Sequence, residues 1–160
     1  MTRDDLLELV LPADRIVVVG GPNTGKSTLA HALGQGLPEP THQVRSTDEL
    51  VGVLEWSEVS AEVARWLDEP GPWVIEGVAT ARALRKWLAA HPGERLDLTV
   101  VLLSKAFGET SKGQAAMGKG VATVWNEIVI EVLARGARVI NAAAPKPVRE
   151  ERESAAQATA

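Results

Sequence analysis

One segment constrains this chain more than any other: IVVVGGPNTGKSTLAHAL, which spans Ile16 to Leu33. Its first four residues, 16–19, are β-branched and apolar, which favours a buried strand. Residues 28–33 are typical of the beginning of a helix. Between them, Gly20 to Ser27 fit the spacing G-x-x-x-x-G-K-[ST]. A strand, a glycine-rich loop and a helix in this order predict a loop that binds phosphate groups.

Each position of this loop has a chemical reason. Glycines let backbone N–H groups approach an anion, and the N-terminus of the next helix favours negative charge. Lys26 would place its ammonium on the β- and γ-phosphates, and Ser27 offers a hydroxyl to Mg²⁺. We therefore expect ATP and Mg²⁺ at this loop, with ATP as the default donor. The residues expected to contact the nucleotide are Gly21, Pro22, Asn23, Thr24, Gly25, Lys26, Ser27 and Thr28.

Length and composition limit the remaining possibilities. The 160 residues are enough for one domain, expected over 1–147, followed by a flexible tail at 148–160. The absence of cysteine excludes disulfides, thiolate metal sites and cysteine nucleophiles. No apolar run is long enough to span a membrane and the acidic start is unlike a secretory signal, so we expect a cytoplasmic protein with no membrane partner. The net charge of −4 gives no global attraction to nucleic acid, although a local basic patch stays open.

The rest of the chain alternates strand and helix patterns. Apolar segments predict strands at 16–19, 42–46, 73–75, 98–103 and 137–141, of which the second is the weakest. Helical patterns are found within 1–14 and at 28–33, 57–68, 79–90 and 121–134. The segment 104–120 has three lysines, four glycines and little periodicity, which predicts a mobile loop. The alternation favours an α/β fold with a five-stranded parallel sheet flanked by helices.

Ligands of such sheets bind at the carboxyl ends of the strands. Asp48 follows the second predicted strand, Glu76 the third, Lys105 the fourth and Asn141 the fifth. We expect all four side chains on the side of the bound nucleotide, with its base near Asn141 and the closing loop.

These features resemble the small P-loop kinases, the nucleoside- and nucleotide-kinase-like group of the P-loop NTPases, over about residues 16–145. The motifs are GGPNTGKST, STDEL, VIEG and the lysine-bearing loop before the last helix. The resemblance implies a kinase-like three-layer sandwich. It implies that Asp48 meets the phosphoryl acceptor and that Glu76 orients Mg²⁺ or its water. It also implies a lid at about 104–120 that closes over the phosphates, with Lys105, Lys112 and Lys119 as its cations.

Two features of the sequence depart from the pattern of that group. Its closing loop usually carries arginines, whereas this chain has none between Arg95 and Arg135. Lysine lacks the planar fork that binds phosphate through two hydrogen bonds. The second departure is Glu76, where aspartate is commoner, and the longer side chain favours contact with Mg²⁺ through a water.

Simpler roles also stay open for two of these residues. Asp48 could cap the following helix, and Glu76 could be a solvated turn residue.

The sequence gives weaker signals for the residues that would bind the phosphoryl acceptor. Trp56 could stack on a base. Arg82 and Arg85 could hold a phosphate of the acceptor, or could belong to a solvated helix face.

These observations favour an ATP-dependent kinase that transfers the γ-phosphoryl group to a hydroxyl or phosphate of a nucleoside-like or nucleotide-like acceptor. One alternative is a P-loop kinase of the kind found in bacterial viruses, which phosphorylates a hydroxymethylated pyrimidine in DNA. Another is a nucleotide-binding switch with weak ATPase activity. The N-K-x-D motif of guanine recognition is not found. The acceptor, small molecule or nucleic acid, and the oligomeric state stay open.

Overall fold

The computed structural model describes residues 3–10, 15–36, 43–106 and 108–142. Its elements are, in chain order, α1 (Arg3–Leu9), β1 (Arg15–Gly20), α2 (Lys26–Gly36), β2 (Gln43–Ser46), the 3-10 helix η1 (Thr47–Glu49), α3 (Trp56–Trp66), β3 (Trp73–Gly77), α4 (Thr80–Ala90), β4 (Thr99–Leu103), α5 (Lys112–Ala134) and β5 (Arg138–Ala142). The tail predicted at 148–160 lies outside the described residues. Within them, no helix has both the length and the apolar character needed to cross a bilayer.

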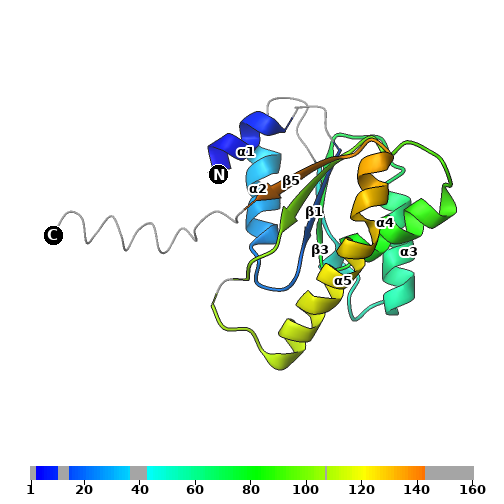
Figure 1. Cartoon of the computed structure of the whole chain (residues 1–160). Helices are drawn as coiled ribbons and strands as arrows, with labels where there is room; N and C mark the ends of the chain where they lie inside the picture. The colour runs from blue at the N-terminus through cyan, green and yellow to red at the C-terminus, as the bar shows by residue number, and fades with distance from the viewer. Residues whose placement is uncertain (1–2, 11–14, 37–42, 107, 143–160) are drawn as a thin grey trace.

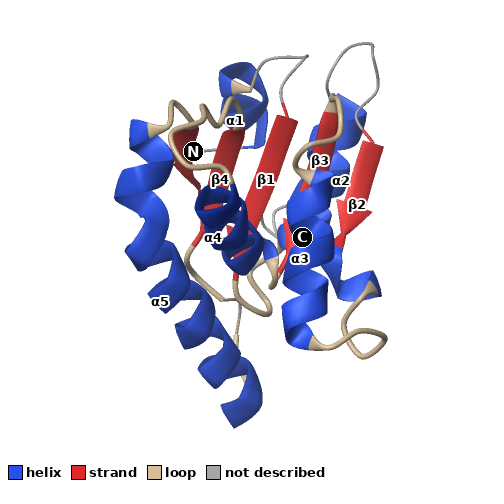
Figure 2. Ribbon diagram, turned by 90° about the vertical axis from the view of Figure 1, so that its right-hand side faces the viewer, coloured by secondary structure: helices blue, strands red, loops and turns tan. Residues whose placement is uncertain are grey.

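The five strands form one sheet in the order β2-β3-β1-β4-β5, and every neighbouring pair is parallel. This confirms the predicted α/β fold with a five-stranded parallel sheet flanked by helices. The chain leaves β1 toward β2 at one edge, and after β3 it crosses to β4 on the other side of β1 (Figure 2). Connections therefore diverge at the carboxyl end of β1, and ligands of open α/β sheets bind at such a point.

Helices cover both faces of this sheet (Figure 1). The side chains of Ile16 and Val18 pack in the apolar cluster that α1 and α2 cover. Val17 and Val19 pack in the second cluster, together with side chains of α3, α4 and α5. All four are completely buried, because a central strand of a sheet covered on both faces has no solvent side. The run of β-branched residues before the glycine-rich loop is thus the centre of the core, and it holds the start of that loop firmly.

The last helix differs from its prediction. The sequence predicts a loop over 104–120, but α5 already begins at Lys112 and runs for 23 residues. The prediction was wrong for the second half of that segment. Of its described residues, only 104–106 and 108–111 lie outside a helix. A capping box begins the helix: Ser111 accepts a hydrogen bond from the backbone N–H of Gln114, whose side chain accepts one from the N–H of Ser111. This arrangement satisfies two N–H groups that a helix start otherwise leaves without partners.

Candidate functional site

The glycine-rich loop turns sharply between β1 and α2. Asn23 has a φ of 57° and Gly25 a φ of 84°, both in the left-handed region that glycine adopts freely and asparagine tolerates. The hydroxyl of Thr24 donates to the carbonyl of Gly21 over 2.9 Å and closes the turn. A Cβ on Gly20 would lie 2.9 Å from the carbonyl oxygen of Leu103 in β4. The glycines at 20 and 25 therefore serve close packing and the turn, and the loop leads directly into the first turn of α2.

Lys26 is held inside this loop. It is 6% exposed, and its Nζ donates to the carbonyl oxygen of Gly21 over 2.6 Å. Burial lowers the pKa of the Lys26 ammonium, while the nearby carboxylates of Glu76 and Asp48 act in the opposite direction. The loop thus holds a desolvated amine at the N-terminus of a helix, where an anion gains most from a positive charge.

A buried carboxylate lies beside this lysine. Glu76, in β3, is 2% exposed, and the hydroxyl of Ser27 donates to its Oε1 over 3.1 Å. The other oxygen, Oε2, is buried and has no hydrogen-bond partner among the described residues. Parallel pairing of β3 with β1 brings this residue to the end of β1, since Val18 pairs with Glu76. The predicted neighbourhood of Lys26, Ser27 and Glu76 is therefore present, and the solvated-turn alternative for Glu76 is wrong.

Hydroxyl and carboxylate oxygens of this kind suit Mg²⁺, which takes few protein ligands and completes its shell with phosphate and water. The described residues contain no group of three or more His, Cys, Asp or Glu side chains that could hold a metal. A magnesium ion here would therefore rely on Ser27, Glu76, water and a bound nucleotide.

Asp48 lies close to this group from the neighbouring strand end. Gly77 has a φ of 139°, and a Cβ on it would overlap the side chain of Thr47, which is fully buried. The Thr47 hydroxyl also accepts a hydrogen bond from the N–H of Ala79 over 3.4 Å. These contacts lock η1 onto the end of β3. The cap of η1 is Ser46, whose hydroxyl accepts from the N–H of Asp48, so the capping alternative for Asp48 is wrong.

The Asp48 side chain is exposed, and its carboxylate has no hydrogen-bond or ion-pair partner among the described residues. Its charge nevertheless acts on Lys26. It is therefore available to a ligand near the loop.

The candidate acceptor residues separate into two groups. The guanidinium of Arg82 lies 5.5 Å from the ring centre of Trp56, which begins α3 and is 41% exposed. Arg82 is half-buried, and within the described chain it has no carboxylate partner and donates no hydrogen bond. Arg85, on the next turn of α4, forms an ion pair with Glu127 of α5 at 3.0 Å. Trp56 and Arg82 are thus brought together, while Arg85 is bound to a different partner.

Two of the three cations predicted for the closing loop, Lys112 and Lys119, lie on a face of α5 turned away from the glycine-rich loop. Lys105 is exposed after β4, and Lys112 and Lys119 are exposed on α5. At about 100° per residue, these two lysines lie about 160° and 140° around the helix from Gln114, which contacts the loop. Asn141 lies inside the edge strand β5 instead of following it, and its side chain is exposed.

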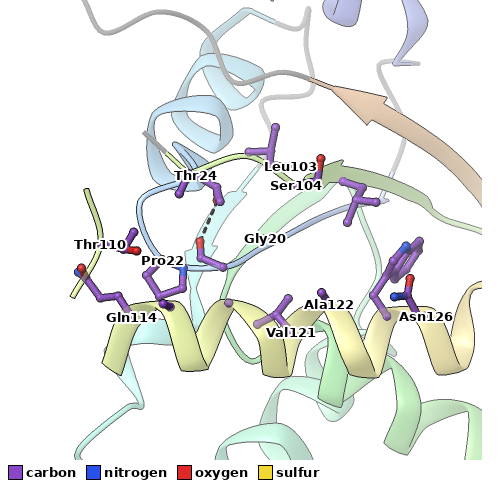
Figure 3. A pocket seen from close by; sticks show the side chains of 16 residues that line it. Gly20, Pro22, Thr24, Leu103, Ser104, Thr110, Gln114, Val121, Ala122 and Asn126 are labelled. Carbon is purple, nitrogen blue, oxygen red and sulfur yellow. Dashed lines mark hydrogen bonds between the residues drawn. The ribbon is translucent and has the colours of Figure 1, made fainter. Parts of the chain in front are cut away.

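Sequence reasoning missed two residues of α5 that lie against the loop, Gln114 and Gly118. They line a cavity of about 280 Å³ between the loop, the end of β4 and α5. Figure 3 shows Gln114 of α5 beside Pro22 of the loop, with Val121 and Asn126 farther along the same helix. One local signal was present, since the pattern S-x-x-Q at 111–114 is a capping box and marks a helix start.

No protein-family model and no curated protein matches this chain.

Proposed function

We propose that this chain is an ATP-dependent kinase, which transfers the γ-phosphoryl group of ATP to a hydroxyl or phosphate of a nucleoside-like or nucleotide-like acceptor. The observation that supports this best is the Ser27–Glu76 hydrogen bond beside the buried Lys26. It leaves one buried carboxylate oxygen without a partner. Such an oxygen is costly to bury, and a bound cation would relieve that cost.

The donor side follows from this geometry. Backbone N–H groups of the loop and the N-terminus of α2 would bind the phosphates, and Lys26 would neutralise part of their charge. Ser27 and Glu76 would hold Mg²⁺, Glu76 either directly or through water. When bound, the ion neutralises charge on the β- and γ-phosphates. The position at the carboxyl end of β1, where the connections diverge, supports this assignment.

Asp48 is the candidate general base. Its carboxylate has no partner in the described chain and lies near enough to Lys26 for their charges to interact. For a hydroxyl acceptor, the carboxylate would orient the O–H group and accept its proton. The acceptor oxygen then bonds to the γ-phosphorus, the bond from that phosphorus to the β–γ bridging oxygen breaks, and ADP leaves. A phosphate acceptor already offers an anionic oxygen and needs no proton removal.

Trp56 and Arg82 would hold the acceptor. The exposed indole offers a flat apolar surface, and the guanidinium has its N–H donors free for a planar anionic group such as phosphate. The resemblance to the small P-loop kinases adds support, since it assigns the acceptor to the strand end that carries Asp48.

The experiment is a screen of transfer from γ-labelled ATP to nucleosides, nucleotides and DNA with modified bases. We expect Mg²⁺-dependent labelling of one acceptor class, lost in Lys26→Ala and retained in Arg95→Ala, which removes a surface ion pair with Asp97. Labelling of DNA that falls steeply with added salt would identify the DNA kinase alternative. ATP hydrolysis without any labelled acceptor would overturn the kinase proposal in favour of a nucleotide-binding switch.

A further inference from the structure

The first turns of α5 contact the phosphate-binding loop backbone to backbone. A Cβ on Gly21 would lie 2.8 Å from the Cα of Gly118, closer than real Cβ contacts come. A Cβ on Gly118 would meet nothing within 4 Å. The loop pattern leaves position 21 open to any residue. Glycine at this position is therefore explained by the approach of the helix.

A side-chain contact lies beside this backbone contact. The Asn23 amide donates to Oε1 of Gln114 over 3.3 Å. The same oxygen accepts from the backbone N–H of Ser111 over 3.0 Å, as part of the capping box. One oxygen thus joins the start of α5 to the residue of the loop that has a left-handed backbone.

The start of α5 has little helical stability of its own. Gly113, Gly118 and Gly120 all lie within its first nine residues, 112–120. Each costs a helix interior about 1 kcal/mol relative to alanine. Most of these residues are exposed and bury little apolar surface. Because the segment is weak alone, its place is set by the loop it touches. The loop is held by the helix in return.

We propose that the first turns of α5 are a positioning element of the donor site, in which Gln114 acts through Asn23 to hold the loop in its phosphate-binding shape. This rests on the proposed function, because it concerns the affinity of the same loop for ATP. Gln114 is a positioning residue and does not touch the reacting atoms. The same turns also reach the acceptor side, since Gly120 lies beside Arg82. The start of α5 therefore contacts both the loop proposed to bind ATP and Arg82, which is proposed to bind the acceptor.

The test is a double-mutant cycle in which calorimetry measures the Kd for ATP with Mg²⁺. Asn23→Gly removes the amide and keeps a residue that adopts a positive φ freely, so this variant is expected to fold. Gln114→Ala removes the accepting oxygen. Each single variant is expected to weaken ATP binding about threefold to tenfold, the value of one hydrogen bond. The double variant is expected to bind no more weakly than the weaker single variant.

Two controls separate positioning from helix stability. Ser111→Ala removes the capping hydroxyl and leaves the Asn23–Gln114 bond, while Gly113→Ala strengthens the helix away from the loop. Both are expected to shift the melting temperature with little change in the Kd for ATP.

Three results would overturn the proposal. The Kd for ATP could be unchanged in Gln114→Ala. The increase in Kd in the double variant could equal the product of the increases in the two single variants. Ser111→Ala could weaken ATP binding as much as Gln114→Ala does. Failure of the unchanged chain to bind ATP would overturn the proposed function and this inference together. ATP binding by the unchanged chain with independent single effects would overturn this inference alone.

Discussion

The two sides of the glycine-rich loop between β1 and α2 are built in opposite ways. On one side, Lys26 at the start of α2 and Glu76 near the end of β3 are almost fully buried. On the other side, the first turns of α5 are largely exposed, rich in glycine and attached through Gly21 and Gln114. The buried side depends on a few polar residues that the packed core of the sheet holds in place. The exposed side depends on contacts between segments about a hundred residues apart in the chain.

The largest effect should follow a change on the buried side. Lys26→Ala removes the charge that the loop would place on the donor phosphates under the proposed function. We expect about a 10²- to 10³-fold loss of kcat/KM, the size seen when one preorganised donor is removed. Arg95→Ala is the control and should stay within twofold. Comparable rates for Lys26→Ala and the unchanged chain would show that the loop is not the donor site.

Glu76→Gln tests the buried carboxylate. It keeps an oxygen for the Ser27 hydroxyl but removes the charge, so we expect about a 10- to 100-fold loss of transfer rate. The free energy of unfolding should change little, because removing a buried carboxylate oxygen without a partner is offset by losing the attraction of Glu76 to Lys26. Rate measurements and urea unfolding check the two parts. A large loss of stability with an unchanged rate would make Glu76 a structural residue.

The two arginines of α4 provide a matched pair on the acceptor side. Arg82→Lys should raise the KM for the acceptor about tenfold, because lysine cannot make paired hydrogen bonds to a planar anion. Arg85→Lys, whose side chain is bound to Glu127 at the surface, should change it less than twofold. Steady-state kinetics with varied acceptor measure both. Equal changes of the KM for the acceptor in the two variants would show that Arg82 has no special role in acceptor binding.

The pH dependence of ATP binding should reflect Lys26. Burial lowers its pKa below the ordinary value of 10.5, so its charge is lost at a lower pH than that of a surface lysine. ATP affinity should therefore fall by a few fold as the pH rises through this lowered pKa, and Lys26→Arg should remove the fall. Over the same window folding stability should rise, since the unfolded chain binds that proton more tightly. Titrations with ATP across alkaline pH check this, and an affinity independent of pH would contradict it.

The smallest effect concerns the exposed side. A Cβ on Gly113 would lie 3.9 Å from the Ser111 hydroxyl and meet nothing else nearby. Gly113→Ala should stabilise the chain by about 1 kcal/mol, or about 2–4 °C in melting temperature. Calorimetry measures the shift. No change, or a decrease, would show that the start of α5 is not limited by its glycine content.

The same contrast explains what the sequence could predict. Short β-branched runs such as 16–19 predicted the strands, because parallel strands buried on both faces need apolar residues throughout. The loop pattern predicted Lys26 and Ser27, and the strand-end rule predicted Glu76 beside them. These signals are local in the chain.

The start of α5 has no such signal beyond its capping box. Glycines at 113, 118 and 120 interrupt the periodicity, and what compensates for them is a backbone contact with Gly21 that no local pattern contains. The pairing of Arg82 with Trp56, and of Arg85 with Glu127, likewise depends on how α4 packs against α3 and α5.

We infer that Ser27 and Glu76 complete a magnesium–nucleotide site around the glycine-rich loop. Titration of ATP into the unchanged chain and into Glu76→Gln, each with and without Mg²⁺, tests it most directly. We expect Mg²⁺ to strengthen ATP binding by the unchanged chain. Glu76→Gln should still bind ATP but lose most of that gain. Absence of ATP binding by the unchanged chain, or an equal gain from Mg²⁺ in both proteins, would contradict it.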